Sequence, residues 1–149
     1  MQALSGTYAL IFSALRITPI AIGKIGMLRV QPGYYVYVGS AFGPGGLKAR
    51  IRHHSKKAAR PHWHIDYLTS ALDLKEIWFT CDPIHREHQW ATIISNTRGS
   101  SAPLAGFGSS DCRCNTHLFF FNSTPGSKNF RRKALSQIDG HSKIHCQIL

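Results

Sequence analysis

The chain has 149 residues, which suits one domain with a single core and is too short for two domains of ordinary size. Its 18 Lys and Arg outnumber its 7 Asp and Glu, giving a formal net charge of +11 with the histidines neutral. Such a surface attracts polyanions, and nucleic acid is the favoured partner, with acidic lipid or an acidic protein as the alternatives. The seven carboxylates are thinly spread, which argues against chemistry that needs several convergent acids, such as a two-metal phosphodiesterase centre.

The apolar segments and the cysteines bear on where the protein works. No apolar run approaches the ~20 residues that a membrane helix needs, so we expect no membrane association. Residues 1–6 lack the basic region and cleavage site of a secretory signal peptide. The four cysteines (Cys81, Cys112, Cys114 and Cys146) do not have the spacing of a disulfide framework. We therefore expect a reducing, cytoplasmic location.

Three segments near the N-terminus have the composition of β-strands: residues 6–12, 24–30 and 34–39. Because they follow one another closely, with a turn at 31–33, they predict an antiparallel meander. A glycine-rich loop at 41–46 then leads into a helix that starts at about Leu47. On this helix Arg50, Ile51 and His54 share one face and are expected to point toward the sheet.

The rest of the chain predicts further helices and strands. A short helix is expected at 61–68, a strand at 75–81, a loop at 98–110, a strand at 118–121 and a helix at about 128–138. The fold class is therefore α/β: a small central antiparallel sheet, with three main strands and additional ones, flanked by helices. Residues 1–122 form the predicted domain, and residues 123–149 form a basic C-terminal tail with a short helix, within that domain or appended to it.

A carboxylate stands on the apolar face of one predicted helix. Asp82 followed by Pro83 is typical of a helix start, as an N-cap acid and a first-position proline. On that helix Glu87 shares a face with Ile84, Ala91 and Ile94. A carboxylate on such a face is costly unless it is paired, hydrogen-bonded or metal-bound. The alternative is a partly exposed helix glutamate.

Several blocks of the sequence resemble the GIY-YIG nuclease superfamily. Gly-Thr-Tyr at 6–8 and Tyr-Val-Gly at 37–39 are similar to the two elements that name it. Residues 47–54 resemble its Leu-x-x-Arg-Leu-x-x-His helix, and Glu87 stands where the superfamily places a metal-binding glutamate. Segments 22–26, 33–41, 62–68 and 106–114 resemble one branch, whose members occur alone or fused to the repair enzyme endonuclease III. The resemblance covers about residues 5–121.

The sequence departs from the family pattern at a few positions. Thr7 and Val38 replace isoleucines, and both are β-branched residues that suit a strand. The branch has Glu-Cys-Glu near the metal-binding glutamate, where this chain has Glu87, His88 and Gln89.

The resemblance implies a GIY-YIG-type, metal-dependent endonuclease that hydrolyses phosphodiester bonds in nucleic acid, with DNA as the favoured substrate and DNA repair as the setting. Glu87 would hold one Mg²⁺ or Mn²⁺ ion with waters, and Arg50 would contact the scissile phosphate. Tyr37 would act as the general base, and Tyr8 would position the water or support Tyr37. His54 would orient Tyr37 or relay its proton. Taken singly, the same tyrosines are more often strand aromatics, and the Arg50–His54 pair a surface or core feature.

A basic flank is expected to contact phosphates, its alternative being a merely solvated face. Its residues are Lys48, Arg52, Lys56, Lys57 and Arg60. Two other functions suit the same fold: a non-catalytic nucleic-acid-binding module, and a domain that recruits a repair-protein partner.

A short run of cysteines precedes the predicted strand at 118–121. A zinc site is one interpretation, with Cys112, Cys114 and His117 as ligands and Asp111 or Cys146 as the fourth. Their spacing is not that of common structural zinc sites, so packed thiols are preferred. His62 and His64 are expected near the substrate without a catalytic role.

Overall fold

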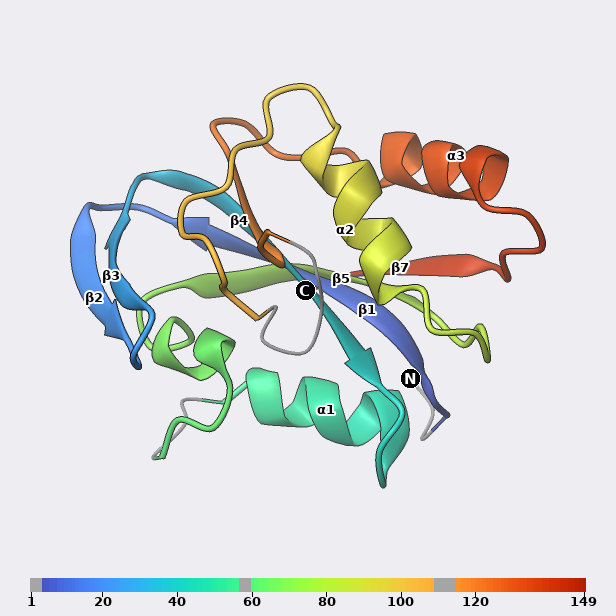
Figure 1. Ribbon diagram of the computed structural model, residues 1–149, viewed down its shortest axis with the longest axis horizontal. Coiled ribbons are helices and arrows are strands. Elements are labelled where there is room, and N and C mark those ends of the chain that lie inside the picture. The colour runs from blue at the N-terminus through green and yellow to red at the C-terminus, as the bar shows by residue number, and fades with distance from the viewer. Residues whose placement is uncertain (1–3, 57–59, 109–114) are drawn as a thin grey trace.

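A five-stranded antiparallel sheet forms the centre of the protein (Figure 1). The computed structural model describes residues 4–56, 60–108 and 115–149. The strand order is β6-β4-β1-β5-β7, with bounds Leu118–Phe121, Gly33–Ala41, Gly6–Ala14, Asp73–Thr80 and Ile144–Ile148. A separate two-stranded sheet pairs β2 (Thr18–Ile22) with β3 (Gly26–Val30). Within the described residues the helices are α1 (Gly46–His54), η1 (His64–Tyr67, a 3₁₀ helix), α2 (Glu87–Ser95) and α3 (Ser127–Gln137). The predicted α/β class with a central antiparallel sheet is confirmed.

Helices cover both faces of the sheet (Figure 1). Side chains alternate between the faces of a strand, so Leu10 and Phe12 of β1 pack in the core on the α1 side. Ala9 and Ile11 pack in the second core, with α2 and α3. Because both faces of β1 are covered, its sequence is apolar almost throughout rather than alternating.

The predicted meander of three neighbouring strands is wrong in one respect, because β3 lies outside the central sheet. β1 pairs directly with β4, from Gly6 opposite Ala41 to Ala14 opposite Gly33. β3 pairs instead with β2, a strand that the sequence did not predict. Ile22 of β2 and Leu28 and Val30 of β3 are buried and join the core on the α1 side. The hairpin therefore buries one face as an extension of that core.

The C-terminal residues 123–149 add a helix and an edge strand to the same core. Phe130 and Ala134 of α3 are buried on the α2 side of the sheet, and Phe130 stacks on Trp78 of β5 with ring centroids 4.9 Å apart. β7, which the sequence did not predict, pairs with β5 from Glu76–Ile148 to Thr80–Ile144.

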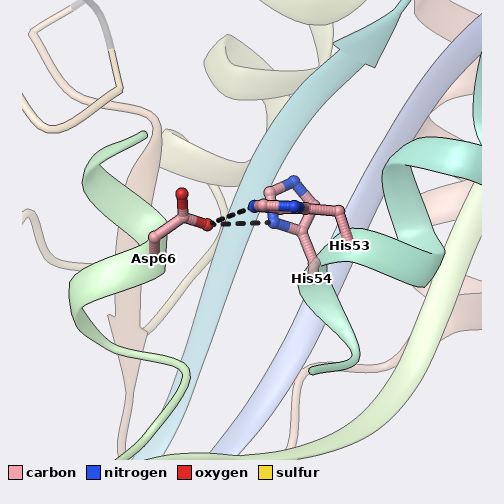
Figure 2. A group of neighbouring side chains, drawn as sticks. All are labelled: His53, His54 and Asp66. Atoms are coloured by element: carbon pink, nitrogen blue, oxygen red, sulfur yellow. Dashed lines mark hydrogen bonds and ion pairs between the residues drawn. The ribbon is translucent and has the colours of Figure 1, made fainter. Parts of the chain in front are cut away.

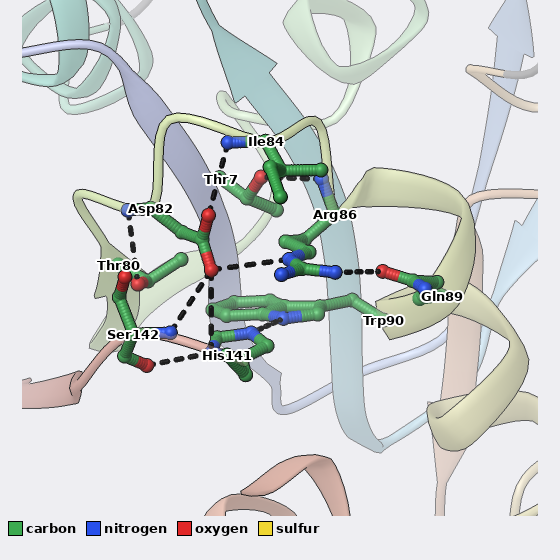
Figure 3. A network of polar contacts seen from close by, with 9 residues as sticks. All are labelled: Thr7, Thr80, Asp82, Ile84, Arg86, Gln89, Trp90, His141 and Ser142. Carbon is green, nitrogen blue, oxygen red and sulfur yellow. Dashed lines mark hydrogen bonds and ion pairs between the residues drawn. The ribbon is translucent and has the colours of Figure 1, made fainter. Parts of the chain in front are cut away.

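The loop between β5 and α2 contains a buried acid that does not cap a helix (Figure 3). α2 begins at Glu87, so the predicted helix start at Asp82 and Pro83 is wrong. The Asp82 carboxylate instead accepts hydrogen bonds from the backbone N–H groups of Ile84 and Ser142, each at 2.9 Å. An aspartate that bonds the backbone two residues on favours a turn over a helix, which explains the late start of α2.

A buried arginine fixes the first residue of α2. Arg86 donates from Nε to Asp82 at 3.1 Å and from Nη1 to Gln89 at 3.1 Å (Figure 3). Its backbone N–H donates to the Thr7 hydroxyl of β1 at 3.2 Å. These contacts place Glu87, the next residue, close to the end of the central sheet.

Among the residues that the structure describes, no helix combines the length and apolar character that crossing a bilayer requires.

Candidate active site

A cleft of about 250 Å³ opens where β4 runs past its pairing with β6. That pairing ends at Tyr37 opposite Leu118, and Gly39 and Ser40 lie beyond it. The cleft is lined by Tyr8, Tyr37, Gly39, Ser40, Arg50, His62, Trp63, His64, Glu87, His88, Gly108 and His117. Four of the five predicted catalytic residues therefore line one cleft, although they come from β1, β4, α1 and α2.

Gly39 allows the Tyr8 ring to cross the sheet at the base of the cleft. The two residues are directly opposite in the β1–β4 pairing. A Cβ atom at Gly39 would lie 2.5 Å from the Tyr8 hydroxyl oxygen, closer than such atoms can approach. The position therefore requires glycine so that the Tyr8 ring can lie across β4.

His54, the fifth predicted residue, contacts Tyr8 rather than Tyr37. Its Nε2 lies 2.8 Å from the Tyr8 hydroxyl, whereas the Tyr37 ring meets it edge-on with centroids 6.0 Å apart. His54 therefore has its side-chain hydrogen bond with Tyr8, and its predicted role of orienting Tyr37 or relaying its proton stays a prediction. Tyr8 is on β1, the strand next to β4. Its ring lies over Gly39, so its hydroxyl meets His54 at the C-terminal end of α1.

The proton positions in this contact follow from charge. Burial lowers the pKa of His54 to about 3, although the Asp66 carboxylate acts to raise it, so the ring is neutral at pH 7. Nδ1 faces Asp66 Oδ1 at 3.8 Å. A proton on Nδ1 avoids placing a nitrogen lone pair against a carboxylate, so Nε2 accepts the hydrogen bond from the Tyr8 hydroxyl.

Both cleft tyrosines keep their protons at neutral pH. The pKa of Tyr8 is raised well above its ordinary value, by burial first and then by Tyr37, while Arg50 acts to lower it. The pKa of Tyr37 is also raised, by burial and then by the Glu87 carboxylate, again with Arg50 opposing.

The Arg50 guanidinium is fixed on one wall of the cleft. It donates from Nη1 to the Ser40 carbonyl oxygen at 3.0 Å and lies over the Trp63 ring, 4.3 Å from its centroid. A planar cation held in this way is suited to contact the oxygens of a phosphate or carboxylate.

Glu87 presents an ionised carboxylate to the cleft from the first turn of α2. Its side chain is 20% exposed, and Oε1 lies 2.9 Å from His117 Nδ1. Burial raises its pKa, but the contact with His117 and a hydrogen bond from Ser40 outweigh that effect, so the pKa is below its ordinary value. The prediction that Ile84 shares a helix face with Glu87 is wrong, because Ile84 precedes α2 and is 57% exposed.

The donor set at Glu87 fits a hard divalent cation with few protein ligands. Glu87 supplies the one carboxylate among the described residues that line the cleft. Mg²⁺ keeps several waters and is commonly held by one or two carboxylates, with the remaining ligands from the substrate. The residues present therefore suit Mg²⁺ or Mn²⁺ better than a metal that needs a complete protein cage.

Two residues of this region were missed or misplaced by the sequence analysis. Asp66 of η1 was not singled out, yet its side chain is buried and its Oδ1 lies 3.0 Å from His53 Nε2. An acid between apolar residues of a short helix was the available signal. His117 was considered only as a zinc ligand, and here it contacts Glu87.

The predicted basic flank lies outside the cleft where the structure describes it. Lys48, Arg52, Lys56 and Arg60 are exposed, and none of these four is among the residues that line the cleft. Lys57, Asp111, Cys112 and Cys114 lie outside the described residues.

The structure also places Cys146 and the two histidines His62 and His64. Cys146 is on β7, at the opposite edge of the sheet from β6, which His117 precedes. This excludes the less favoured alternative in which Cys146 completes a zinc site with His117. His62 and His64 line the cleft, and His64 Nδ1 accepts a hydrogen bond from the Gly108 backbone N–H at 2.7 Å.

The fold and the cleft define an α/β protein with a polar site that contains tyrosines, an arginine, histidines and, among the described residues, one carboxylate. Residues 7–139 match a family model described as Domain of unknown function DUF123, and the chain belongs to this family. The match includes every residue that lines the cleft. Neither a curated protein nor a solved structure matches the chain.

Proposed function

We propose that the protein is a GIY-YIG-type endonuclease that hydrolyses phosphodiester bonds in nucleic acid, with DNA as the favoured substrate and Mg²⁺ or Mn²⁺ as the cofactor. The observation that carries the proposal is the convergence of Tyr8, Tyr37, Arg50 and Glu87 in one cleft. Tyr8, Tyr37 and Arg50 stand in blocks that resemble the superfamily, and Glu87 stands where the superfamily places a metal-binding glutamate. Their meeting in space supports a shared catalytic role.

The cleft offers the groups that phosphodiester hydrolysis needs. The reaction requires an activated water, neutralisation of the phosphoryl oxygens and stabilisation of the leaving oxygen. Arg50 would bind the phosphate through its guanidinium, and Glu87 would hold the cation. When bound, such a cation neutralises charge on the phosphate and lowers the pKa of coordinated water. The net charge of +11 favours association with the polyanion.

The contacts favour Tyr8 over Tyr37 as the general base. The Tyr8 hydroxyl lies 2.8 Å from Nε2 of the neutral His54 ring, which can accept its proton. Arg50 acts to lower the pKa of both tyrosines, so the hydrogen bond to His54 is what distinguishes them. Tyr37 meets the same imidazole only through its ring edge. We therefore assign proton abstraction to Tyr8, with His54 as its proton acceptor, and orientation of the water to Tyr37.

A second candidate is a nucleic-acid-binding module without efficient turnover. Two observations favour it: the pKa values of both tyrosines are raised, and Glu87 is the one carboxylate among the described residues of the cleft. In this case binding needs no divalent cation, and substitution of Glu87 leaves function unchanged.

Cleavage of labelled duplex, single-stranded, flap and branched DNA, with Mg²⁺ or Mn²⁺, separates the two candidates. We expect metal-dependent cleavage that falls by about 10²–10³-fold in Glu87→Gln and Arg50→Gln, with DNA binding measured in parallel. Asp139→Asn is the matched control, because Asp139 is an exposed carboxylate beyond α3.

The tyrosine variants test the assignment of the base. Tyr8→Phe should lose more cleavage than Tyr37→Phe, and the reverse order would return the base to Tyr37. Binding without cleavage on every substrate would support the module, and the absence of nucleic-acid binding would refute both candidates.

A further inference from the structure

Three ligand atoms converge at the C-terminal end of α1, next to the cleft. His53 and His54 are the last two residues of α1, and Asp66 lies on η1 opposite them (Figure 2). His53 Nε2, His54 Nδ1 and an Asp66 carboxylate oxygen lie within 4.8 Å of one another. Asp66 Oδ1 is 3.0 Å from the first nitrogen and 3.8 Å from the second. Atoms at such separations can share one small cation.

One of these atoms is a buried nitrogen without a hydrogen bond. The His54 side chain is 1% exposed, and Nδ1 has no hydrogen-bond partner among the residues that the structure describes. The 3.8 Å separation from Asp66 Oδ1 is too long for a hydrogen bond. Because a buried polar atom without a partner is unfavourable, this nitrogen indicates that a bound group completes the cluster.

The other polar atoms of the two buried ligands are already held in place. Asp66 Oδ2 accepts hydrogen bonds from the backbone N–H groups of His62 at 2.8 Å and Trp63 at 2.9 Å. His54 Nε2 is hydrogen-bonded to the Tyr8 hydroxyl, as the acceptor in the metal-free protein and as the donor once Nδ1 holds a metal. Metal-binding histidines and carboxylates are characteristically oriented by such outer contacts, which fix the ring and the carboxylate before the ion arrives.

The remaining ligand provides access from solvent. The His53 side chain is 37% exposed, so an ion can enter beside it and keep a water in its fourth position. The ion would lie at the C-terminal end of α1, where the helix dipole favours positive charge. The nearby Arg50 opposes a cation, but the Asp66 carboxylate offsets one unit of that charge.

We propose that His53, His54 and Asp66 form a Zn²⁺ site, with a water or another exogenous ligand completing a tetrahedral shell. Two imidazole nitrogens and one carboxylate oxygen are a typical three-residue set for zinc and are less suited to Mg²⁺, which prefers oxygen ligands. The site is distinct from Glu87 and from the Mg²⁺ or Mn²⁺ ion of the proposed nuclease. It stands on its own contacts, whether or not the protein cleaves nucleic acid.

Cobalt substitution tests the site on the full chain. After removal of metals with a chelator, we expect one equivalent of Co²⁺ to give the visible absorption of a tetrahedral ion, and Zn²⁺ to displace it. His53→Ala should weaken binding by about 100-fold or more, because loss of even an outer-shell partner costs about 10–100-fold. His62→Ala, which changes a neighbouring histidine outside the triangle, should give the same tetrahedral Co²⁺ absorption as the wild type.

A second variant guards against effects of folding. Asp66→Asn keeps an oxygen for the backbone N–H groups of His62 and Trp63 but removes the charge, and it should also weaken Co²⁺ binding. The far-ultraviolet circular dichroism of each variant shows whether it has folded.

Three results would overturn the proposal. They are no Co²⁺ binding by the wild type, undiminished binding in folded His53→Ala and Asp66→Asn, or intense thiolate-to-cobalt absorption, which would assign the ion to cysteines. Because the readout is metal spectroscopy, its failure is distinguishable from a failure to cleave DNA.

Discussion

The buried ion pair between Arg86 and Asp82 should dominate the stability of the loop that positions Glu87. The two side chains are 6% and 2% exposed, and Nε lies 3.1 Å from Oδ2. Arg86→Met keeps much of the apolar volume but leaves the Asp82 carboxylate buried without its cation. Breaking a buried pair in this way typically costs about 3–5 kcal/mol. Two backbone N–H groups still hold Asp82, so we expect the lower part of that range.

A double-mutant cycle isolates the interaction. Asp82→Asn alone leaves Arg86 without its counter-ion, whereas the double variant Asp82→Asn with Arg86→Met removes both charges. We expect the double variant to lose less unfolding free energy than the two single variants together, by about 1–3 kcal/mol. Arg132→Met is the matched control, because Arg132 is exposed on α3, and it should change stability by less than about 0.5 kcal/mol.

Urea unfolding with linear extrapolation gives the free energies of unfolding for the four proteins of the cycle and for the control. A loss below about 1 kcal/mol for Arg86→Met, with simple additivity in the double variant, would refute the reasoning. A domain of this size has a stability of about 5–15 kcal/mol, so the expected loss lies within a measurable range.

Three further predictions follow from the cleft and the basic flank. First, the pKa of His54 is lowered to about 3, so below about pH 6.5 this side chain binds a proton in the unfolded chain but not in the folded one. The free energy of unfolding therefore falls as the pH falls. From pH 7 to pH 5 this group should cost about 2 kcal/mol, measured by urea unfolding with chelator present, and His54→Gln should show a correspondingly flatter profile. Second, Gly39→Ala should displace the Tyr8 ring and reduce both stability, by about 1–3 kcal/mol, and cleavage, whereas Gly43→Ala, with open space around its Cβ position, should change neither. Third, if Lys48 and Arg52 contact phosphates, changing each to Gln should lower the salt slope of DNA binding by about 0.9 per residue, equally for all sequences, and an unchanged slope would reject those contacts.

The fold was predictable from the sequence where local patterns are strong. The aromatic and β-branched runs of β1 and β4 and the amphipathic turn after Leu47 lie close to their predicted positions. β2 and β7 were missed because their local strand pattern is weak, and their pairing partners are decided by packing. Asp82 and Pro83 carry the local signal of a helix start, although α2 begins only at Glu87. The acid is nevertheless drawn into contacts with Arg86 and with Ser142, which is sixty residues away.

The candidate site divides in the same way. The resemblance to a known superfamily singles out Tyr8, Tyr37, Arg50 and Glu87 from the sequence alone. The structure brings all four to one cleft. The approach of η1 to α1, and of the segment before β6 to α2, depends on tertiary packing. Asp66 and His117 therefore acquire their partners only in the folded chain. The choice between Tyr8 and Tyr37 likewise depended on which hydroxyl reaches His54.

His54 is the residue where the two proposals meet. Its Nε2 contacts the Tyr8 hydroxyl, and its Nδ1 faces the proposed zinc position beside Asp66. A neutral imidazole carries one proton, so a metal on Nδ1 requires the proton to be on Nε2. Nε2 would then donate to Tyr8 and could not accept its proton. If both proposals hold, zinc binding and proton abstraction by Tyr8 exclude one another. Zinc should then inhibit cleavage in the wild type and have a much weaker effect in His53→Ala, whose His54 remains available to Tyr8.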